Sequence, residues 1–258
     1  MKDKEAKNLQ NEGYCILKNQ ISPEWIGDLK VGVEKAFVEH RQIQLQNDND
    51  ITTDGVALHA ILSDPIFISF LYELRRIELF KHIKSYFFKS NFILNSFSAL
   101  DNLPHKPNFS GIVHRDCRFF SNNIPIMLNT LVLLDDFTKD NGPTLLLPYS
   151  HREEEKPSDE DFFENSVQTL GRAGDIILFD SNVWHASSKN QTPNNRKALP
   201  ITFTKPNIKQ LLDYPRAIGY EKMDNFDKEM QQLLGYHSRV PSNLDEWYQP
   251  AEKRFYRE

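Results

Sequence analysis

Apolar side chains recur at helical spacing through residues 1–90 of this chain. Ser22 is a favourable helix cap and Pro23 suits a first helical position, so a helix is predicted to begin there. Its apolar stripe, at intervals of four residues, consists of Trp25, Leu29, Val33 and Phe37. A second helical pattern over 66–88 contains Phe67, Leu71, Leu74 and Leu79. We also predict a short strand over 13–17 and a polar loop over 46–55.

From residue 92 onward the apolar residues gather in short segments that predict β-strands. These segments span 92–100, 124–137, 144–147, 175–179 and 199–204. Turns are predicted at Asn141-Gly142-Pro143 and Ala173-Gly174-Asp175, and the acidic range 151–165 is predicted to be a loop. Several strands without long helices between them predict an antiparallel double sheet, arranged as a barrel or jelly roll. The expected fold class is mainly β with flanking helices.

The length of 258 residues suits one domain, and no stretch of linker composition divides the chain. We therefore expect a single domain over 1–258. In this interpretation residues 1–90 form a mainly helical scaffold and residues 91–206 form the β core. Residues 207–258 would form a C-terminal helix and a tail that cover the barrel.

Charge and composition exclude several classes of partner. A net charge of −5 and a pI near 5.9 leave no basic stripe for a phosphate backbone, so no nucleic acid is expected. No apolar run approaches the roughly 20 residues of a membrane-spanning helix. Cys15 and Cys117 are too far apart to indicate a disulfide framework. We expect a cytoplasmic protein, and nothing indicates a membrane or a protein partner.

The first candidate for chemistry is the tripeptide His114-Arg115-Asp116. In an extended segment, side chains two residues apart point to the same side. His114 and Asp116 could therefore meet one ion while Arg115 points away. Taken alone, this spacing is more typical of a solvated polar loop.

His185 follows the apolar segment 175–179 and is the second candidate. A single histidine there is more often a hydrogen-bonded core or turn residue. Together with the first pair, however, it supplies two imidazoles and one carboxylate, the set that holds iron(II) and leaves coordination positions open. Hydrolytic zinc sites use the same ligands, so zinc is the competing metal.

Arg196 favours iron over zinc. It stands eleven residues after His185, and a short hairpin through 191–195 would bring it beside the metal strand. A planar guanidinium can hold the far carboxylate of 2-oxoglutarate by two parallel hydrogen bonds. A zinc hydrolase would not need this arginine. The competing interpretation is an ordinary surface arginine in a polar loop.

With these features in this order, the chain resembles the phytanoyl-CoA dioxygenase family of iron(II)- and 2-oxoglutarate-dependent oxygenases over nearly its whole length. The matching motifs are His114-x-Asp116, Asn141-Gly142-Pro143, Pro148-Tyr149-Ser150-His151, Gly174-Asp175, Trp184-His185-x-Ser187, Arg196, Leu234-Gly235-Tyr236, Arg239-Val240-Pro241 and Glu246-Trp247-Tyr248. The last three look like bacterial members. Each motif is loose by itself, but their ordered combination is specific.

The resemblance implies a double-stranded β-helix, which is a cupin-like jelly roll. It implies that His114, Asp116 and His185 bind iron(II). It also implies that Arg196 binds the C5 carboxylate of 2-oxoglutarate, with a further hydroxyl contact from Ser187.

Three more residues are possible lining residues of the site. His151 matches a family position there, although a structural role in its loop fits equally well. Arg115 stands between the ligands where the family commonly has glutamine. Asn102 lies near the place of a cosubstrate lysine that this sequence does not show. Tyr149 also replaces the usual glycine before Ser150, so cosubstrate contacts beyond Arg196 and Ser187 stay open.

The implied reaction consumes O2 and 2-oxoglutarate, releases succinate and CO2, and hydroxylates a small molecule. Asp116 fills the position that halogenating relatives leave open with glycine or alanine, so hydroxylation is expected rather than chlorination. Two alternatives remain: a zinc-dependent hydrolase on the same ligands, and a catalytically silent ligand-binding barrel. The resemblance does not select among acyl-CoA, amino acid, sugar or other substrates.

Overall fold

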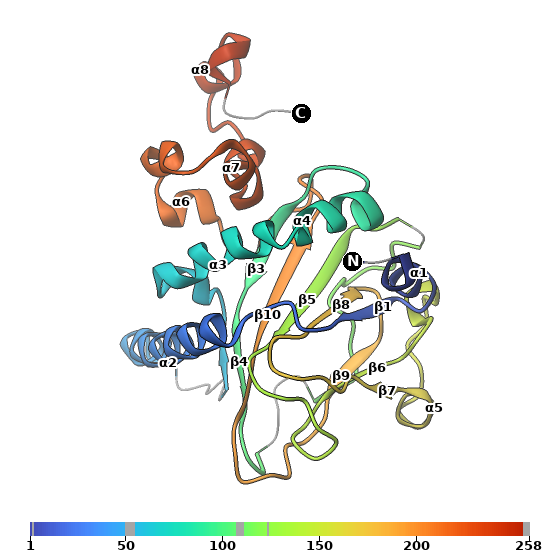
Figure 1. The fold of residues 1–258 in the computed structure, drawn as a ribbon. Helices are drawn as coiled ribbons and strands as arrows, with labels where there is room; N and C mark the ends of the chain where they lie inside the picture. The colour runs from blue at the N-terminus through green and yellow to red at the C-terminus, as the bar shows by residue number, and fades with distance from the viewer. Residues whose placement is uncertain (2, 50–54, 107–110, 123, 255–258) are drawn as a thin grey trace.

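Two antiparallel sheets face each other in the computed structural model, which describes residues 1, 3–49, 55–106, 111–122 and 124–254 (Figure 1). The larger sheet has seven strands in the order β1-β8-β5-β10-β4-β2, and β3 also pairs with β10. The smaller sheet has the order β7-β6-β9. The predicted mainly β fold with flanking helices is confirmed. The sheets form an open jelly roll, not a closed barrel.

The larger sheet carries most of the strand residues. Its members are β1 (Tyr14–Leu17), β2 (Val56–Ala57), β3 (Ile93–Phe97), β4 (Ala99–Asn102), β5 (Met127–Leu133), β8 (Ile176–Asp180) and β10 (Arg196–Thr204). The smaller sheet consists of β6 (Thr144–Leu146), β7 (Val167–Gln168) and β9 (His185–Ser187). β10 is the longest strand and pairs with β3, β4 and β5, so it is the centre of the larger sheet.

Helices lie mainly on the outer face of the larger sheet (Figure 1). The α-helices are α1 (Asp3–Asn11), α2 (Pro23–Gln46), α3 (Pro65–Arg76), α4 (Leu79–His82), α5 (Asp159–Asn165), α6 (Tyr214–Ile218), α7 (Lys228–Leu234) and α8 (Leu244–Trp247). A π-helical turn, η2 (Ile83–Phe88), follows α4, and short 3-10 turns are η1 (Ala60–Leu62), η3 (Ser150–Arg152), η4 (Tyr220–Asn225), η5 (Tyr236–Ser238) and η6 (Ala251–Lys253).

The core has two main layers. One buried cluster joins the helices to the outer face of the larger sheet, and it includes Leu199 and Ile201 of β10. A second cluster fills the space between the two sheets, where Ala198 of β10 meets Leu146 of β6. Successive residues of a strand point to opposite faces, so β10 contributes to both layers. The face that carries Ala198 is the one that faces the smaller sheet.

The helix predicted after Ser22 is confirmed. Ser22 caps α2, where its side chain accepts a hydrogen bond from Trp25 N at 3.4 Å. Leu29 and Val33 are fully buried, and Trp25 and Phe37 pack against the same cluster. The apolar stripe of this helix is therefore the face that packs on the core. Residues 50–54 of the predicted loop lie outside the described residues.

Several predicted boundaries were wrong. The single helix over 66–88 is broken at Glu78, which adopts a left-handed backbone with φ of +61°. The strand over 92–100 divides into β3 and β4 on either side of Ser98. The acidic range 151–165 is not all loop, since it contains α5, which is capped by Ser158.

The C-terminal region was expected to cover the sheets as a helix and a tail, but its two parts lie differently. α6 and α7 pack on the core through Tyr214, Met230 and Leu234, which are buried. α8, in contrast, projects away from the rest of the chain (Figure 1). It carries exposed apolar side chains at Leu244 and Trp247. Only the first part of the C-terminal region therefore belongs to the core.

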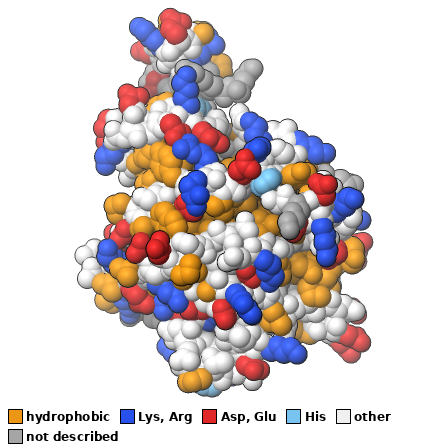
Figure 2. All heavy atoms as spheres, in the orientation of Figure 1, with side chains coloured by type: hydrophobic (Ala, Val, Ile, Leu, Met, Phe, Trp, Pro, Cys, Tyr) orange, Lys and Arg blue, Asp and Glu red, His pale blue; other side chains and the backbone are white. Residues whose placement is uncertain are grey.

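Charged side chains of both signs are interspersed on the face drawn in Figure 2, without an extended basic patch. None of the helices in the described part of the chain is long and apolar enough to cross a membrane. The single-domain organisation over 1–258 stays a prediction.

Candidate metal centre and cosubstrate site

His114 and His185 are brought together by backbone pairing. They form an isolated antiparallel bridge in which His114 N donates to His185 O at 3.0 Å and His185 N donates to His114 O at 2.8 Å. His185 is the first residue of β9, and His114 lies in a segment outside the named strands. This bridge explains how two histidines 71 positions apart in the sequence reach one place.

The ring hydrogen bonds fix which nitrogen of each histidine faces the site. His114 Nδ1 lies 2.7 Å from Ile112 O, and His185 Nδ1 lies 2.9 Å from Val183 O. A backbone carbonyl only accepts, so each Nδ1 carries a proton, and in the neutral form of each ring Nε2 keeps a lone pair. Carbonyl partners of this kind are typical of metal-ligating histidines.

The two Nε2 atoms converge on Asp116. His114 Nε2 lies 3.5 Å from Asp116 Oδ1, and His185 Nε2 lies 3.6 Å from Asp116 Oδ2. One ligand atom from each residue falls within 4.8 Å of the other two. Two imidazole nitrogens and a carboxylate oxygen on one side of an ion are the donor set of non-haem iron(II) oxygenases. The geometry therefore fits the predicted ligand set.

Electrostatics favour an ionised carboxylate at the centre. Desolvation beside the two imidazole rings would raise the pKa of Asp116, but His185, His114 and the Asn129 amide together hold it at about 2. Burial lowers the pKa of His185, which keeps this ring neutral and able to bind a metal. Burial also acts to lower the pKa of His114, but its hydrogen bond to Asp116 outweighs that effect and raises it. A bound cation would replace the proton that Asp116 attracts to His114.

Arg196 is fully buried at the start of β10. Its Nη2 donates to Gly142 O at 2.6 Å, and its guanidinium carbon lies 4.0 Å from the centre of the Phe137 ring. Nε and Nη1 have no hydrogen-bond partner among the described residues. Burial lowers the pKa of Arg196 to about 9, although Asp101 and Asp135 oppose the shift. A buried cation with two unused donors is costly, so the site suits an anion.

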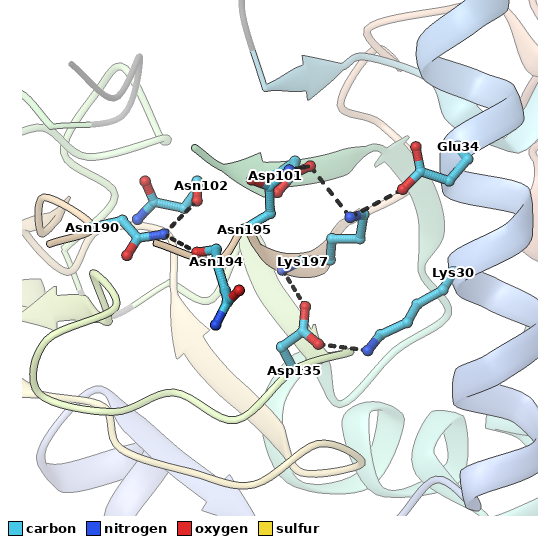
Figure 3. Close-up of polar contacts among 9 residues, drawn as sticks. All are labelled: Lys30, Glu34, Asp101, Asn102, Asp135, Asn190, Asn194, Asn195 and Lys197. Carbon is cyan, nitrogen blue, oxygen red and sulfur yellow. Dashed lines mark hydrogen bonds and ion pairs between the residues drawn. The ribbon is translucent and has the colours of Figure 1, made fainter. Parts of the chain in front are cut away.

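The two carboxylates that act on the pKa of this arginine, Asp101 and Asp135, are engaged with other residues (Figure 3). Asp101 accepts from Asn195 Nδ2 at 2.7 Å and lies 3.4 Å from Lys197 Nζ. Asp135 accepts from Lys197 N at 2.8 Å and from Lys30 Nζ at 2.5 Å. Lys197 follows Arg196 on β10 and so points to the opposite face of the sheet. The arginine is left without a carboxylate partner of its own within the described chain.

Arg196 faces the same space as the metal ligands. On β10 it lies on the face of Ala198, which packs between the two sheets. Phe137, beneath the guanidinium, belongs to this cluster, as does Phe179, whose ring centre lies 5.0 Å from that of His185. A ligand that reaches from the triad to Arg196 would therefore lie between the sheets.

Asn102 lies beside Arg196, because the two residues are register partners on β4 and β10. Asn102 Nδ2 donates to Gly142 O and to Ser188 O, both at 3.1 Å. Gly142 has a positive φ of +76°, and a Cβ there would fall 2.2 Å from Asn102 Nδ2. Only glycine therefore allows its carbonyl to reach both side chains.

The other three predicted residues, Ser187, His151 and Arg115, have the following neighbours. Ser187 lies two positions past His185 on β9 and pairs with Thr144. His151, on η3, packs against Gly13, where a Cβ would fall 2.5 Å from its Nδ1. Arg115 donates through Nη2 to Glu153 O at 2.6 Å, and its guanidinium lies over Trp184 at 4.1 Å. Arg115 therefore points away from the ligands on either side of it.

Sequence reasoning did not identify Phe137 or Asn129 as neighbours of the predicted site residues. Phe137 had no signal beyond its place at the end of a predicted strand. Asn129 is a polar residue inside the apolar segment 127–133, which could have marked it.

Comparison with known proteins agrees with this geometry. A family model described as phytanoyl-CoA dioxygenase (PhyH) matches residues 9–198. The chain belongs to the phytanoyl-CoA dioxygenase family. It is therefore a dioxygenase of the non-haem iron, 2-oxoglutarate-dependent class. The matched range includes the triad and Arg196 and ends within β10.

This member of the phytanoyl-CoA dioxygenase family has relatives in bacteria and fungi. An uncharacterised protein of Mycobacterium tuberculosis is 35% identical over 208 residues, covering 79% of this chain and 75% of that protein. A protein of Aspergillus terreus named dioxygenase trt7 is 25% identical over 274 residues, covering 96% of this chain and 89% of that protein.

Solved structures share the fold. AviO1 from Streptomyces viridochromogenes has a TM-score of 0.60 at 17% identity, covering 80% of this chain and 96% of that one. SnoK, described as a non-haem alpha-ketoglutarate-dependent carbocyclase from nogalamycin biosynthesis, has a TM-score of 0.61 at 16% identity. That match covers 80% of this chain and 85% of SnoK. At these identities the similarity concerns the fold alone.

Proposed function

We propose that this chain hydroxylates a small molecule with iron(II), 2-oxoglutarate and O2, and that it releases succinate and CO2. In this proposal His114, Asp116 and His185 hold the iron, and Arg196 holds the C5 carboxylate of 2-oxoglutarate. The observation that carries the proposal is the buried guanidinium of Arg196, whose Nε and Nη1 find no partner in the described residues.

The residues of the site have separate roles. The triad supplies two neutral imidazoles and one carboxylate, which leaves coordination positions for the cosubstrate. Arg196 would complete its hydrogen bonding with a carboxylate, and Phe137 supports the flat face of the guanidinium. When bound, iron with 2-oxoglutarate supplies the activation of oxygen. The apolar walls between the sheets, including Leu131 and Leu133, exclude water from the reacting atoms.

Two further parts of the proposal concern substrate and compartment. The fungal relative is named a dioxygenase and SnoK a carbocyclase, which supports a small organic substrate for this chain as well. We place the protein in the cytoplasm, because Cys15 and Cys117 are both free and buried and because iron(II) requires reducing conditions.

Arg196 also weighs against the zinc hydrolase alternative. A hydrolase on the same ligands would not need a buried arginine with unused donors between the sheets. A silent ligand-binding barrel would have no reason to keep both Nδ1 atoms on carbonyls and both Nε2 atoms directed at Asp116. We therefore retain the oxygenase as the proposal.

Binding and turnover assays test it together. Iron(II) and 2-oxoglutarate added without oxygen should give the visible metal-to-ligand charge-transfer band, and oxygen should then yield succinate. His114→Ala, Asp116→Ala and His185→Ala should each lose the band and the succinate. Succinate at the wild-type rate from all three variants, or activity with zinc alone, would contradict the proposal.

A further inference from the structure

A row of side chains crosses the larger sheet directly beneath the metal ligands. Asn129 on β5 is the register partner of Phe179 on β8 and of Thr202 on β10. The Phe179 ring packs against His185, with ring centres 5.0 Å apart. Asn129 Nδ2 donates to Asp116 Oδ2 at 2.6 Å. One row of the sheet therefore contacts two of the three ligands.

Asp116 and Thr202 together fix the orientation of the Asn129 amide, because the carboxylate can only accept and the Thr202 hydroxyl can donate to the amide oxygen. Thr202 Oγ1 donates to Asn129 Oδ1 at 2.8 Å, so the amide oxygen faces the hydroxyl and the NH2 group faces Asp116. The opposite orientation would place the amide oxygen against a carboxylate oxygen, where neither atom can donate. Asn129 is only 6% exposed, so few other partners are available to it.

Asp116 needs such support more than the two histidines do. The histidines share backbone hydrogen bonds with each other, and each ring is held by a carbonyl. Asp116 lies outside the named strands, and its side chain is 38% exposed. Its hydrogen bond to Asn129 is the contact that ties the carboxylate to the larger sheet.

We propose that Asn129 and Thr202 are positioning residues for the metal: they hold Oδ2 of Asp116 and leave Oδ1 as its ligand atom. This inference rests on the proposed function, in which the triad binds iron. A partner that orients a ligating carboxylate commonly changes metal affinity by about 10- to 100-fold when it is removed. Asn129→Leu, which keeps the branched shape of the side chain but is bulkier and removes the donor, should weaken metal binding by an amount of this order.

Thr202 allows a sharper test, because the same strand contains a matched control. Thr204 Oγ1 is buried and has no hydrogen-bond partner within the described chain. Thr202→Val and Thr204→Val therefore make the same isosteric change on β10, but only the first removes a hydrogen bond to Asn129. Thr202→Val should weaken metal binding by about 2- to 10-fold, the usual effect of one neutral hydrogen bond. Thr204→Val should leave it unchanged, and Thr202→Ser should keep wild-type affinity.

The measurement is a titration of the protein with Co²⁺ in air and with Fe²⁺ without oxygen, and it does not depend on turnover. Equal metal affinities for Thr202→Val, Thr204→Val and wild type would overturn the inference and leave the proposed function standing. If the wild-type chain binds neither ion, the proposed function itself fails. The Asn129 side-chain NH2 signals in the metal-free protein give a second readout. Asp116→Ala and Thr202→Val should both shift them in NMR spectra, and Thr204→Val should not.

Discussion

The carboxylate of Asp175 shows how one residue joins two segments that are distant in the sequence. It lies in the turn before β8 and is almost fully buried. Asn19 N donates to it at 2.7 Å, Arg172 N at 2.9 Å and Lys18 Nζ at 3.0 Å. These contacts link the end of β1 to the start of β8, the strand that leads to His185. The turn predicted at this position is thus also an anchor.

Asp175 should make stability depend on pH in the acid range. Burial would raise its pKa, but the backbone donors of Arg172 and Asn19 and the Lys18 ammonium outweigh burial and lower it below the usual 3.8. A depressed pKa contributes stability that is present above the unfolded value and is lost as pH falls through the folded value. Asp175→Asn should therefore lower the Tm at pH 7, and this difference should shrink below pH 3.8. Thermal scans of both proteins from pH 7 to pH 3 measure it, and a constant difference would contradict the assignment.

At the scale of elements, ion pairs connect helix α2 to β10, the strand that carries Arg196, and to the residues beside it. Lys30 and Glu34 lie one turn apart on α2. Lys30 forms an ion pair with Asp135, and Glu34 forms one with Lys197 (Figure 3). Lys197 also lies 3.4 Å from Asp101, its register partner on β4. The side chain of Lys197 is only 14% exposed and that of Asp101 only 9%, so this pair is poorly screened by water.

Lys197→Met should destabilise the chain because it leaves Asp101 without its cation. We expect a loss of about 1–3 kcal/mol in the free energy of unfolding, the usual cost of an unpaired buried polar group. Adding Asp101→Asn should recover part of that loss. Lys35→Met is the matched control, since the Lys35 side chain pairs with Asp64 but is 60% exposed, and its loss should cost below about 1 kcal/mol. Urea unfolding of the wild-type protein and these three variants measures the free energies. Equal losses of unfolding free energy for the two single lysine variants would contradict a stabilising role of the Lys197–Asp101 ion pair.

The elements were predictable where local pattern and tertiary packing agree. The stripe on α2 is buried as expected, because capping and apolar spacing specify the same helix. The break at Glu78 was not predictable, because the apolar spacing continues through it. β10 begins three residues before the predicted segment 199–204. Its first residues, Arg196 and Lys197, are polar, and only the partners around them explain their place in a buried strand.

The site also divides into residues with a signal in the sequence and residues whose place depends on distant partners. His114, Asp116, His185 and Arg196 could be proposed as site residues from the sequence because their residue types and order suggest one chemistry. Asn129 and Thr202 could not, since their roles arise from register between distant strands and leave no spacing signal in the sequence.

The whole molecule consists of a helical layer, the larger sheet and the smaller sheet, with α8 outside this arrangement (Figure 1). Among the described residues 239–254 none is buried. Removing the chain beyond Pro241 should therefore leave the Tm close to that of the full-length protein. Leu234→Ala should instead cost about 2–5 kcal/mol, because Leu234 is fully buried in the cluster beneath the helices. Calorimetry of both variants makes the comparison, and a large loss on truncation would show that α8 packs on the body in solution.

The central claim is that the space between the sheets is built to hold 2-oxoglutarate, with iron at one end and Arg196 at the other. Titration of 2-oxoglutarate into the iron-loaded protein without oxygen, followed by the charge-transfer band, tests it most directly. Arg196→Ala should weaken 2-oxoglutarate binding by about thirty-fold or more, which corresponds to roughly 2–5 kcal/mol for one partner of a buried charge pair. The affinity of Arg196→Lys for 2-oxoglutarate should lie between those of the wild-type protein and Arg196→Ala, because lysine keeps the charge and loses the planar geometry. Both variants should bind iron as the wild-type protein does. If Arg196→Ala binds 2-oxoglutarate as tightly as the wild-type protein, the account is contradicted.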